Sequence, residues 1–414
     1  MKGLILTYAL TYLGAPVALF SPYIGLLIYV AFAIIQPTSM WFWIVEPGSY
    51  AKIIGGAMLL GWAIHGFGKW KLGRGGAITA LFAGFLGWAA VCAACVAWNK
   101  QHAIEYIVMM LKILAPFLVG VTTIDNVRKL KGLAWTMVLC QGYVAFEFNA
   151  WYYQGWNRVR LEGFGGMDNN CVAIAMVTGA GLAFFLAMSE RRLWLKGLGF
   201  LAAVLQAHVV MFSNSRGGML AMIVTAGVGF LLIEKQPKHL VAFVLMLALG
   251  LRLAGPEVRE RFSSAFVDPK ERDGAASARL MTWRLAVVTM AKKPLFGVGP
   301  GNWLDYAPTQ IGRHLHVHSV WLETGAELGL PGVGMLMAFF GGCCLRLWPL
   351  TRPRTPVPDP WYRDAARMSI AAIVGYCVAS QFVSLIALEL PYYVVLLGAC
   401  ALKLWSTPEG WPAA

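Results

Sequence analysis

A short polar turn interrupts an apolar run in the middle of the chain and carries an arginine among small residues. Residues 213–218 read SNSRGG, so Arg216 stands beside two glycines at the entry to the next apolar segment. A guanidinium pairs bidentately with phosphate oxygens, and the positive end of a helix also attracts anions. Arg216 therefore suits an anion site, although a simple interfacial turn with an arginine that reaches the membrane surface explains these residues equally well.

Three histidines alternate with other residues further along the chain. Residues 314–319 read HLHVHS, and in an extended strand the three imidazoles would share one face. A metal site is the weaker interpretation, because no carboxylate or cysteine lies at a recognisable ligand spacing. One histidine that acts as a general base at the start of an apolar helix is the stronger one, since an ordinary imidazole titrates near neutral pH.

The segment Ser277–Lys293 has the pattern of an amphipathic helix. Its apolar residues recur at spacings of three and four: Leu280, Trp283, Val287 and Met290. Such a pattern predicts a helix that lies on the membrane surface. Arg284 follows Trp283 in this helix, and the spacing by itself favours a contact with lipid headgroups over a catalytic role.

Residues 294–302 and residues 158–169 each contain side chains or glycines that suit a ligand site as well as a turn or a helix cap. Residues 294–302, PLFGVGPGN, lack the GK[ST] of a P-loop and fit a structural turn as well as a binding loop. Arg158 and Arg160 precede an apolar segment and could bind phosphate or sugar. Asp168 or Asn169, at the start of that segment, is better explained as the cap of a helix.

The elements that position these residues are predicted membrane spans. The 414-residue chain is 58% hydrophobic and 13% charged, with a mean hydropathy of +0.63, whereas a soluble protein carries about 25% charged residues. The apolar runs are continuous, which favours helices over the alternating strands of a membrane barrel. Candidate spans lie at 3–20, 22–37, 50–67, 77–97, 104–124, 131–150, 169–188, 195–212, 217–233, 239–254, 329–348, 365–386 and 390–405.

Lysine and arginine cluster in every second loop between these spans, which places those loops in the cytoplasm. This use of the basic residues also explains the net charge of +14 without a nucleic-acid partner. The eight cysteines lie in or beside apolar segments and are predicted to be buried free thiols.

The resulting prediction is an all-α, multi-pass membrane protein with about twelve transmembrane helices. Residues 1–254 form the N-terminal bundle, 255–328 a helical periplasmic loop domain, and 329–414 the C-terminal helices. Loops 151–168 and 213–218 share the outer side with the loop domain, and the C-terminus lies inside. The first two segments are closely joined. If both cross fully, the N-terminus lies outside; we expect them to make one broken or re-entrant crossing, which gives twelve spans and places the N-terminus inside.

The stretch from Phe212 to Gly332 resembles the O-antigen ligase family, which includes the bacterial WaaL ligases. The matching segments are SNSRGG at 213–218, RLAVVTMAKKPLFGVGPGNW at 284–303 and HSVWLETGAELGLPG at 318–332. The last fits a family pattern of histidine, a small polar residue, the nine residues 320–328 and then Gly-x-x-Gly. The chain before residue 150 matches only in its apolar spans. It is also similar to the O-glycosylation ligase branch associated with exosortase systems, which leaves the acceptor open.

The resemblance implies a periplasmic reaction without a metal or other cofactor. A glycan moves from undecaprenyl diphosphate to an acceptor, which for a ligase is the lipid A–core oligosaccharide. Arg216, Arg284 and His318 take the positions of the family's essential residues. Elementary chemistry agrees, because cations stabilise the leaving diphosphate, a histidine activates the hydroxyl, and direct attack inverts the sugar. Further substrate contacts are expected from Arg158, Arg160, Asn302, His316 and Ser319.

Several alternatives remain open at this point. An O-antigen polymerase of the Wzy type would use a second lipid-linked glycan as acceptor, and a protein O-oligosaccharyltransferase would use a protein hydroxyl. A transporter or flippase of lipid-linked sugars would place its polar residues near the bilayer midplane. The predicted outer position of the candidate residues favours an enzyme in the bacterial inner membrane, and we expect a monomer surrounded by membrane lipids.

Overall fold

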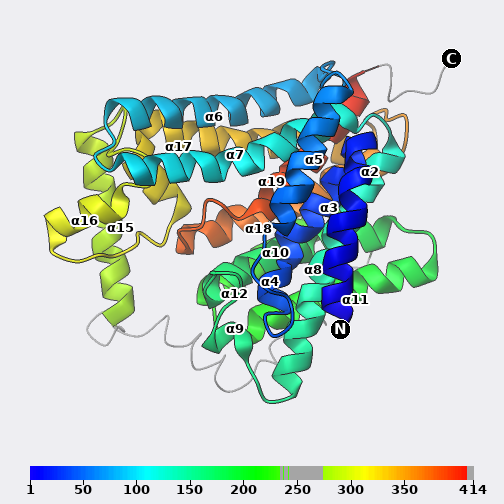
Figure 1. Cartoon of the computed structure of the whole chain (residues 1–414), viewed down its shortest axis with the longest axis horizontal. Coiled ribbons are helices and arrows are strands. Elements are labelled where there is room, and N and C mark those ends of the chain that lie inside the picture. The colour runs from blue at the N-terminus through cyan, green and yellow to red at the C-terminus, as the bar shows by residue number, and fades with distance from the viewer. Residues whose placement is uncertain (234–235, 237–240, 242–273, 408–414) are drawn as a thin grey trace.

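The computed structural model describes residues 1–233, 236, 241 and 274–407, and these are mainly helical (Figure 1). An isolated bridge pairs Phe164 with Met167. The first half contains α1 (Lys2–Tyr8), η1 (Ala9–Leu13), α2 (Gly14–Phe20), α3 (Pro22–Ile35), α4 (Pro37–Met40), α5 (Tyr50–Ile64), η2 (Gly73–Gly75), α6 (Gly76–Cys95), α7 (Lys100–Thr123), α8 (Val127–Tyr153), α9 (Arg158–Leu161) and α10 (Asn169–Ser189). The second contains α11 (Leu193–Phe212), α12 (Arg216–Leu232), α15 (Gly274–Lys292), α16 (Trp303–Ile311), α17 (Val320–Leu347), η5 (Trp348–Thr351), α18 (Trp361–Ala379), η6 (Ser380–Phe382) and α19 (Glu389–Ser406).

Eight helical stretches in the described residues are long and apolar enough to cross a membrane. They are Lys2–Phe20, Pro22–Met40, Gly73–Cys95, Lys100–Thr123, Asn169–Ser189, Leu193–Phe212, Val320–Thr351 and Trp361–Phe382. Two shorter apolar helices, α5 and α12, accompany them. The predicted helical membrane fold is therefore confirmed for the described residues. The number of about twelve stays a prediction, and the candidate span 239–254 lies largely outside the described residues.

The first two apolar segments form separate helical stretches, each long and apolar enough to cross a membrane, and our expectation that together they make one broken or re-entrant crossing stays a prediction. The helical run from α1 to α2 ends at Ser21, whose extended backbone reverses the chain into α3. Trp41 packs against Gly3, and the Tyr23 hydroxyl donates to the Lys129 carbonyl at 2.8 Å. The N-terminus therefore lies at the same end of α3 as Trp41, opposite the basic loop before α8.

Helix α10 is the centre of the bundle. Its span is 89% buried, and it packs against α8, α11, α12 and α18. Its many alanines and glycines allow these neighbours to approach closely. The predicted cap is confirmed, because the Asp168 carboxylate accepts from the Cys171 backbone N–H at 2.8 Å. The N-terminal end of α10 is thereby held in place beside the turn that precedes α12.

Helix α17 begins directly after the histidine segment and bends in its first third. Gly329 adopts a left-handed backbone with φ 69°, two residues before Pro331. At the bend, the Leu330 N–H donates to the Pro294 carbonyl at 2.7 Å, which joins α17 to the loop after α15. The predicted domain boundary after residue 328 coincides with this bend, and α17 continues through it.

Helix α15 packs against α17 and stands across its N-terminal end, at the left of Figure 1. Its buried side carries Thr282, Ala286 and Thr289. The residues of the predicted apolar stripe face different directions: Trp283 turns towards the protein, whereas Val287 is exposed. The predicted apolar residues of α15 therefore do not form a single stripe that faces the membrane.

Candidate functional site

The SNSRGG turn joins α11 to α12 and places Arg216 at the first position of α12. The Ser215 hydroxyl caps this helix by accepting from the Gly218 N–H at 3.2 Å. Asn214 adopts a left-handed backbone with φ 58°, which is uncommon for a residue other than glycine. The Asn169 side chain donates to the Ser213 carbonyl at 2.8 Å and so ties the turn to the start of α10.

The histidine segment ends in a second unusual backbone conformation. His318 has φ 53° and is half-buried, while its neighbours Val317 and Ser319 are buried. The Ser319 hydroxyl caps α17, and the Trp283 indole donates to the Val317 carbonyl at 2.9 Å. Left-handed non-glycine residues persist only where their surroundings hold them, and they gather at functional sites.

The electrostatic environments of these segments indicate that they lie near one another. Burial lowers the pKa of His318. The positive charges of Arg279 and His316 lower this pKa further, whereas the negative charge of Asp168 raises it. Burial also lowers the pKa of Arg279, which Asp168 raises and Arg216 lowers. Burial would raise the pKa of Asp168, but hydrogen bonds at the start of α10 and the His318 charge outweigh it, so this pKa lies below its usual range. Arg216, Arg279, Asp168 and His318 therefore form one group, which we call the cationic site.

Arg279 is the member of this site that the sequence analysis missed. It lies one turn before Trp283 on α15, and residues four apart on a helix share a face. Trp283 is bound to the backbone next to His318, so Arg279 points to the same place. Arg284 lies on another side of α15 and is exposed. The four-residue spacing between Arg279 and Trp283 was the only sequence signal for Arg279. It points to the site only once the hydrogen bond between Trp283 and Val317 is known.

The other predicted substrate contacts fall in different surroundings. His316 is exposed, and its ring centre lies 6.0 Å from that of His318. Ser319 caps α17 and is buried, whereas Arg160 is exposed on α9. Asn302 is buried and uses its amide within the protein, accepting from the Asn99 N–H at 2.6 Å and donating to the Asn99 carbonyl at 3.1 Å. Direct contact with substrate stays a prediction for each of them.

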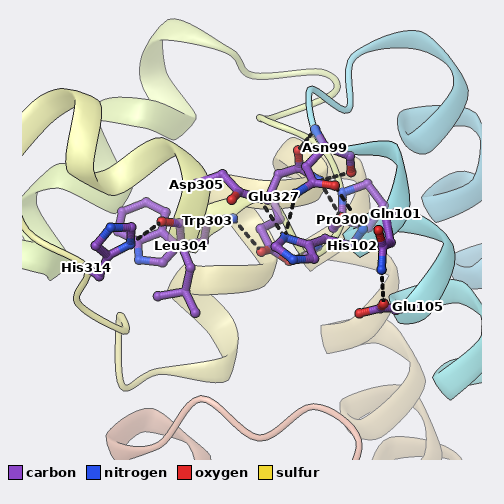
Figure 2. Close-up of polar contacts among 12 residues, drawn as sticks. Asn99, Gln101, His102, Glu105, Pro300, Trp303, Leu304, Asp305, His314 and Glu327 are labelled. Atoms are coloured by element: carbon purple, nitrogen blue, oxygen red, sulfur yellow. Dashed lines mark hydrogen bonds and ion pairs between the residues drawn. The ribbon is translucent and has the colours of Figure 1, made fainter.

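A second polar cluster supports the loop between α15 and α17 (Figure 2). The His102 imidazole lies 2.7 Å from the Asp305 carboxylate, which joins the start of α7 to α16. The buried Glu327 carboxylate accepts from the Gly301 N–H at 3.0 Å and from the Trp303 N–H at 2.9 Å (Figure 2). These contacts hold the base of the loop whose other end carries His318.

The glycines of the 294–302 stretch serve this packing. Gly299 has φ 98°, and a methyl group there would come within 2.6 Å of the Ala97 Cα. Gly297 has φ 63°, and a methyl group there would meet the Ala326 carbonyl oxygen at 2.4 Å. Backbone approaches this close require glycine. Of the two interpretations left open, a structural turn therefore has direct support.

We expect Glu327→Ala to lower the free energy of unfolding by about 2–4 kcal/mol, because the partly buried Gly301 N–H and the buried Trp303 N–H would lose their acceptor. Glu327→Gln keeps one carbonyl oxygen and should be affected less. Thermal unfolding of the purified variants in detergent measures the difference. An alanine variant that melts with the wild type would contradict the supporting role of Glu327.

Arg158 is buried away from the surface, with a side chain that is 7% exposed. Its guanidinium donates to the Ser39 carbonyl at 2.6 Å and lies 3.7 Å from the Glu162 carboxylate. Four aromatic rings surround the guanidinium, with centres 4.7–5.9 Å away: Phe42, Trp151, Trp156 and Phe164. Arg158 therefore braces two outer loops against each other.

This environment predicts that Arg158→Lys destabilises the protein almost as much as Arg158→Met does. A lysine ammonium is not planar and cannot stack on several rings while it also reaches the Ser39 carbonyl. We expect each variant to lose about 2 kcal/mol or more, measured by thermal unfolding in detergent. Wild-type stability in Arg158→Lys would show that charge alone suffices at this position.

The described residues contain no group of three or more histidine, cysteine, aspartate or glutamate side chains that could hold a metal ion. The alternate histidines do not converge with a carboxylate into a ligand set there. Independence from metal stays a prediction that a chelator can test.

Comparison with known proteins is consistent with this arrangement. Residues 201–337 match the family model described as O-antigen ligase, and residues 1–149 match a family of unknown function. An uncharacterized protein of Haemophilus influenzae is 21% identical over 155 residues, which cover 32% of this chain and 39% of that protein. The match thus spans well under two thirds of this relative.

The fold and the cationic site together define a multi-pass helical membrane protein that carries a histidine and two arginines in one place. Residues 201–337, which hold Arg216, Arg279 and His318, match the model of the O-antigen ligase family, in agreement with the sequence resemblance. Members of that family are glycosyltransferase-like enzymes that act on lipid-linked glycans.

Proposed function

We propose that this protein transfers a glycan from undecaprenyl diphosphate to lipid A–core oligosaccharide at the periplasmic face of the bacterial inner membrane. The observation that carries the proposal is the cationic site. His318, Arg216 and Arg279 come from three separate segments; the charge of Arg216 lowers the pKa of Arg279, and the charge of Arg279 lowers the pKa of His318. A transporter of lipid-linked sugars would use the cations to hold the diphosphate but would need no base to activate an acceptor hydroxyl.

His318 is the proposed general base. Burial and the neighbouring charges lower its pKa, so the imidazole is neutral and able to accept a proton near pH 7. It takes the proton of the acceptor hydroxyl as that oxygen attacks the anomeric carbon. The new carbon–oxygen bond forms while the bond to the diphosphate breaks, and its electron pair leaves with the lipid diphosphate. Attack opposite the leaving group inverts the anomeric centre.

Arg216 and Arg279 are the proposed binding groups for the diphosphate. The leaving oxygen gains negative charge as the glycosidic bond breaks, so cations that meet it stabilise the transition state more than the ground state. Arg216 is the first residue of α12, so the positive end of that helix lies beside its guanidinium and adds to the attraction for the diphosphate. Asp168 would stabilise the His318 imidazolium after proton transfer, since its charge favours the protonated ring.

The proposal is tested by reconstituted transfer. Purified protein is mixed with undecaprenyl-diphosphate-linked glycan and lipid A–core in liposomes that contain EDTA, and the lipopolysaccharide is separated by size. A slower-migrating product that His318→Ala does not form supports a metal-independent ligase. Elongated lipid-linked glycan would instead identify a polymerase, and a glycosylated peptide acceptor a protein-directed transferase. Movement of the donor across the bilayer without a new bond would contradict the enzyme.

A further inference from the structure

The described residues enclose a cavity of about 140 Å³ beside the cationic site. It lies between the outer ends of α3, α10 and α19, with α8 forming a further wall. Met167 lines the cavity, and the next residue, Asp168, belongs to the cationic site. Leu385 lines it on another side, while the hydroxyl of the preceding Ser384 donates to Glu323 in the first turn of α17. Two chain segments therefore connect the cavity walls to the surroundings of His318.

Three hydrogen-bonding side chains from three helical regions reach an otherwise largely apolar wall. Gln141 comes from α8 and is 3% exposed; its amide nitrogen lies 3.5 Å from the Met176 sulfur, which is a weak acceptor. Glu389 comes from the start of α19 and accepts from the Tyr393 hydroxyl. Gln36 follows the end of α3. An apolar pocket with a few convergent polar groups is the usual form of a small-ligand site.

The wall at Gln36 is held in an unfavourable conformation. Gln36 adopts a left-handed backbone with φ 46°, as His318 and Asn214 do in the cationic site. Its amide oxygen lies against Gly165, where a methyl group would come within 1.6 Å of it. Strain of this kind is kept where the surroundings enforce it, commonly at binding sites.

The chemistry of the wall selects among ligands. The described residues that line the cavity include no lysine or arginine to pair with a diphosphate, so the charged end of the donor does not fit there. Two amides and a carboxylate suit hydroxyl groups, and the apolar wall with the Phe164 ring suits the carbon face of a sugar. The volume is below the roughly 300–1,000 Å³ of sites for drug-sized ligands, so it suits a single ring.

We propose that this cavity binds one uncharged sugar ring of a substrate glycan next to the point of transfer. The inference rests on the proposed function, because it takes the ligand to be a glycan that the cationic site processes. The same chemistry could come from the donor glycan or from the acceptor oligosaccharide, and the two sources are separated by experiment.

The first experiment measures KM for donor and acceptor separately in the full-length protein and in Gln141→Met, which keeps the volume and removes the amide. The matched control is Gln206→Met, since Gln206 is an equally buried amide on α11 that does not line the cavity. We expect Gln141→Met to raise one KM about five- to tenfold with little change in kcat, and the control to change neither. The substrate whose KM rises supplies the sugar ring.

Binding measurements separate this inference from the proposed function. Affinities are measured for bare undecaprenyl diphosphate, its glycan-linked form and lipid A–core, in wild type, Gln141→Met and Gly165→Ala. If no acceptor is ever glycosylated, the proposed function fails, but weaker binding of one sugar-bearing ligand with unchanged binding of the bare lipid would still support the cavity. Unchanged KM and unchanged binding of every ligand in both variants, with wild-type melting temperatures, would overturn it.

Discussion

Replacing His318 with alanine is expected to reduce glycan transfer by about 10²–10⁴-fold, the range for loss of a general base. The acceptor hydroxyl is a poor nucleophile until its proton is removed, and His318 is the histidine whose pKa responds to the charges of Arg279 and Asp168. Transfer in reconstituted liposomes measures the loss as kcat/KM at fixed acceptor concentration.

Two controls distinguish chemistry from folding. His318→Asn removes the base but suits the left-handed backbone, because asparagine populates that conformation more readily than most residues. We expect it to melt like the wild type and to be as inactive as the alanine variant. His316→Ala changes the exposed neighbouring ring and should keep most of the activity. An active, well-folded His318→Asn would remove His318 from the mechanism.

The pH dependence of transfer follows from the same environment. The base acts in its neutral form, so activity falls as the pH drops through the pKa of His318. Because that pKa is lowered from its ordinary value of 6.5, the acid limb of kcat/KM should lie below pH 6.5. Arg279→Gln removes a positive charge that lowers the pKa, so the limb of its residual activity should move to higher pH. A limb unmoved by this change would contradict the proximity of Arg279 and His318.

The second large effect is expected from Arg279→Ala, with a loss of about 10²–10³-fold in kcat, comparable to removal of one group that stabilises transition-state charge. Arg216→Ala should behave similarly, because Arg216 and Arg279 each contribute to the same local field. Arg284→Ala is the matched comparison, since it removes the same side chain from the same helix at an exposed position. We expect Arg284→Ala to retain far more activity than Arg279→Ala.

This comparison decides between the sequence prediction and the geometry. Arg279→Lys adds a second test, because a lysine keeps the charge but loses the bidentate geometry that suits a phosphate. We expect it to recover part of the activity lost in Arg279→Ala. If Arg284→Ala proves the more damaging of the two alanine variants, the role predicted for Arg284 from the sequence stands and the proposed site must be extended along α15.

The sequence alone determined the membrane class and much of the arrangement of the candidate residues. Continuous apolar runs predict helices because backbone groups in lipid must be satisfied within each segment, and the described part of the chain is helical accordingly. Local signals also determined the cap at Asp168 and the positions of Arg216 and His318 at the starts of helices α12 and α17. These features depend on neighbours within a few residues along the chain.

Only the tertiary structure decided which distant residues meet. The sequence analysis singled out Arg284 and missed Arg279, whereas the hydrogen bond from Trp283 to Val317 turns the Arg279 side of α15 towards His318. Arg158 looked like a ligand for phosphate and proved to be a brace among aromatic rings. Contacts such as those of Trp283 with Val317 and of Arg158 with Ser39 depend on how separate segments pack, and no periodicity along the chain records that packing.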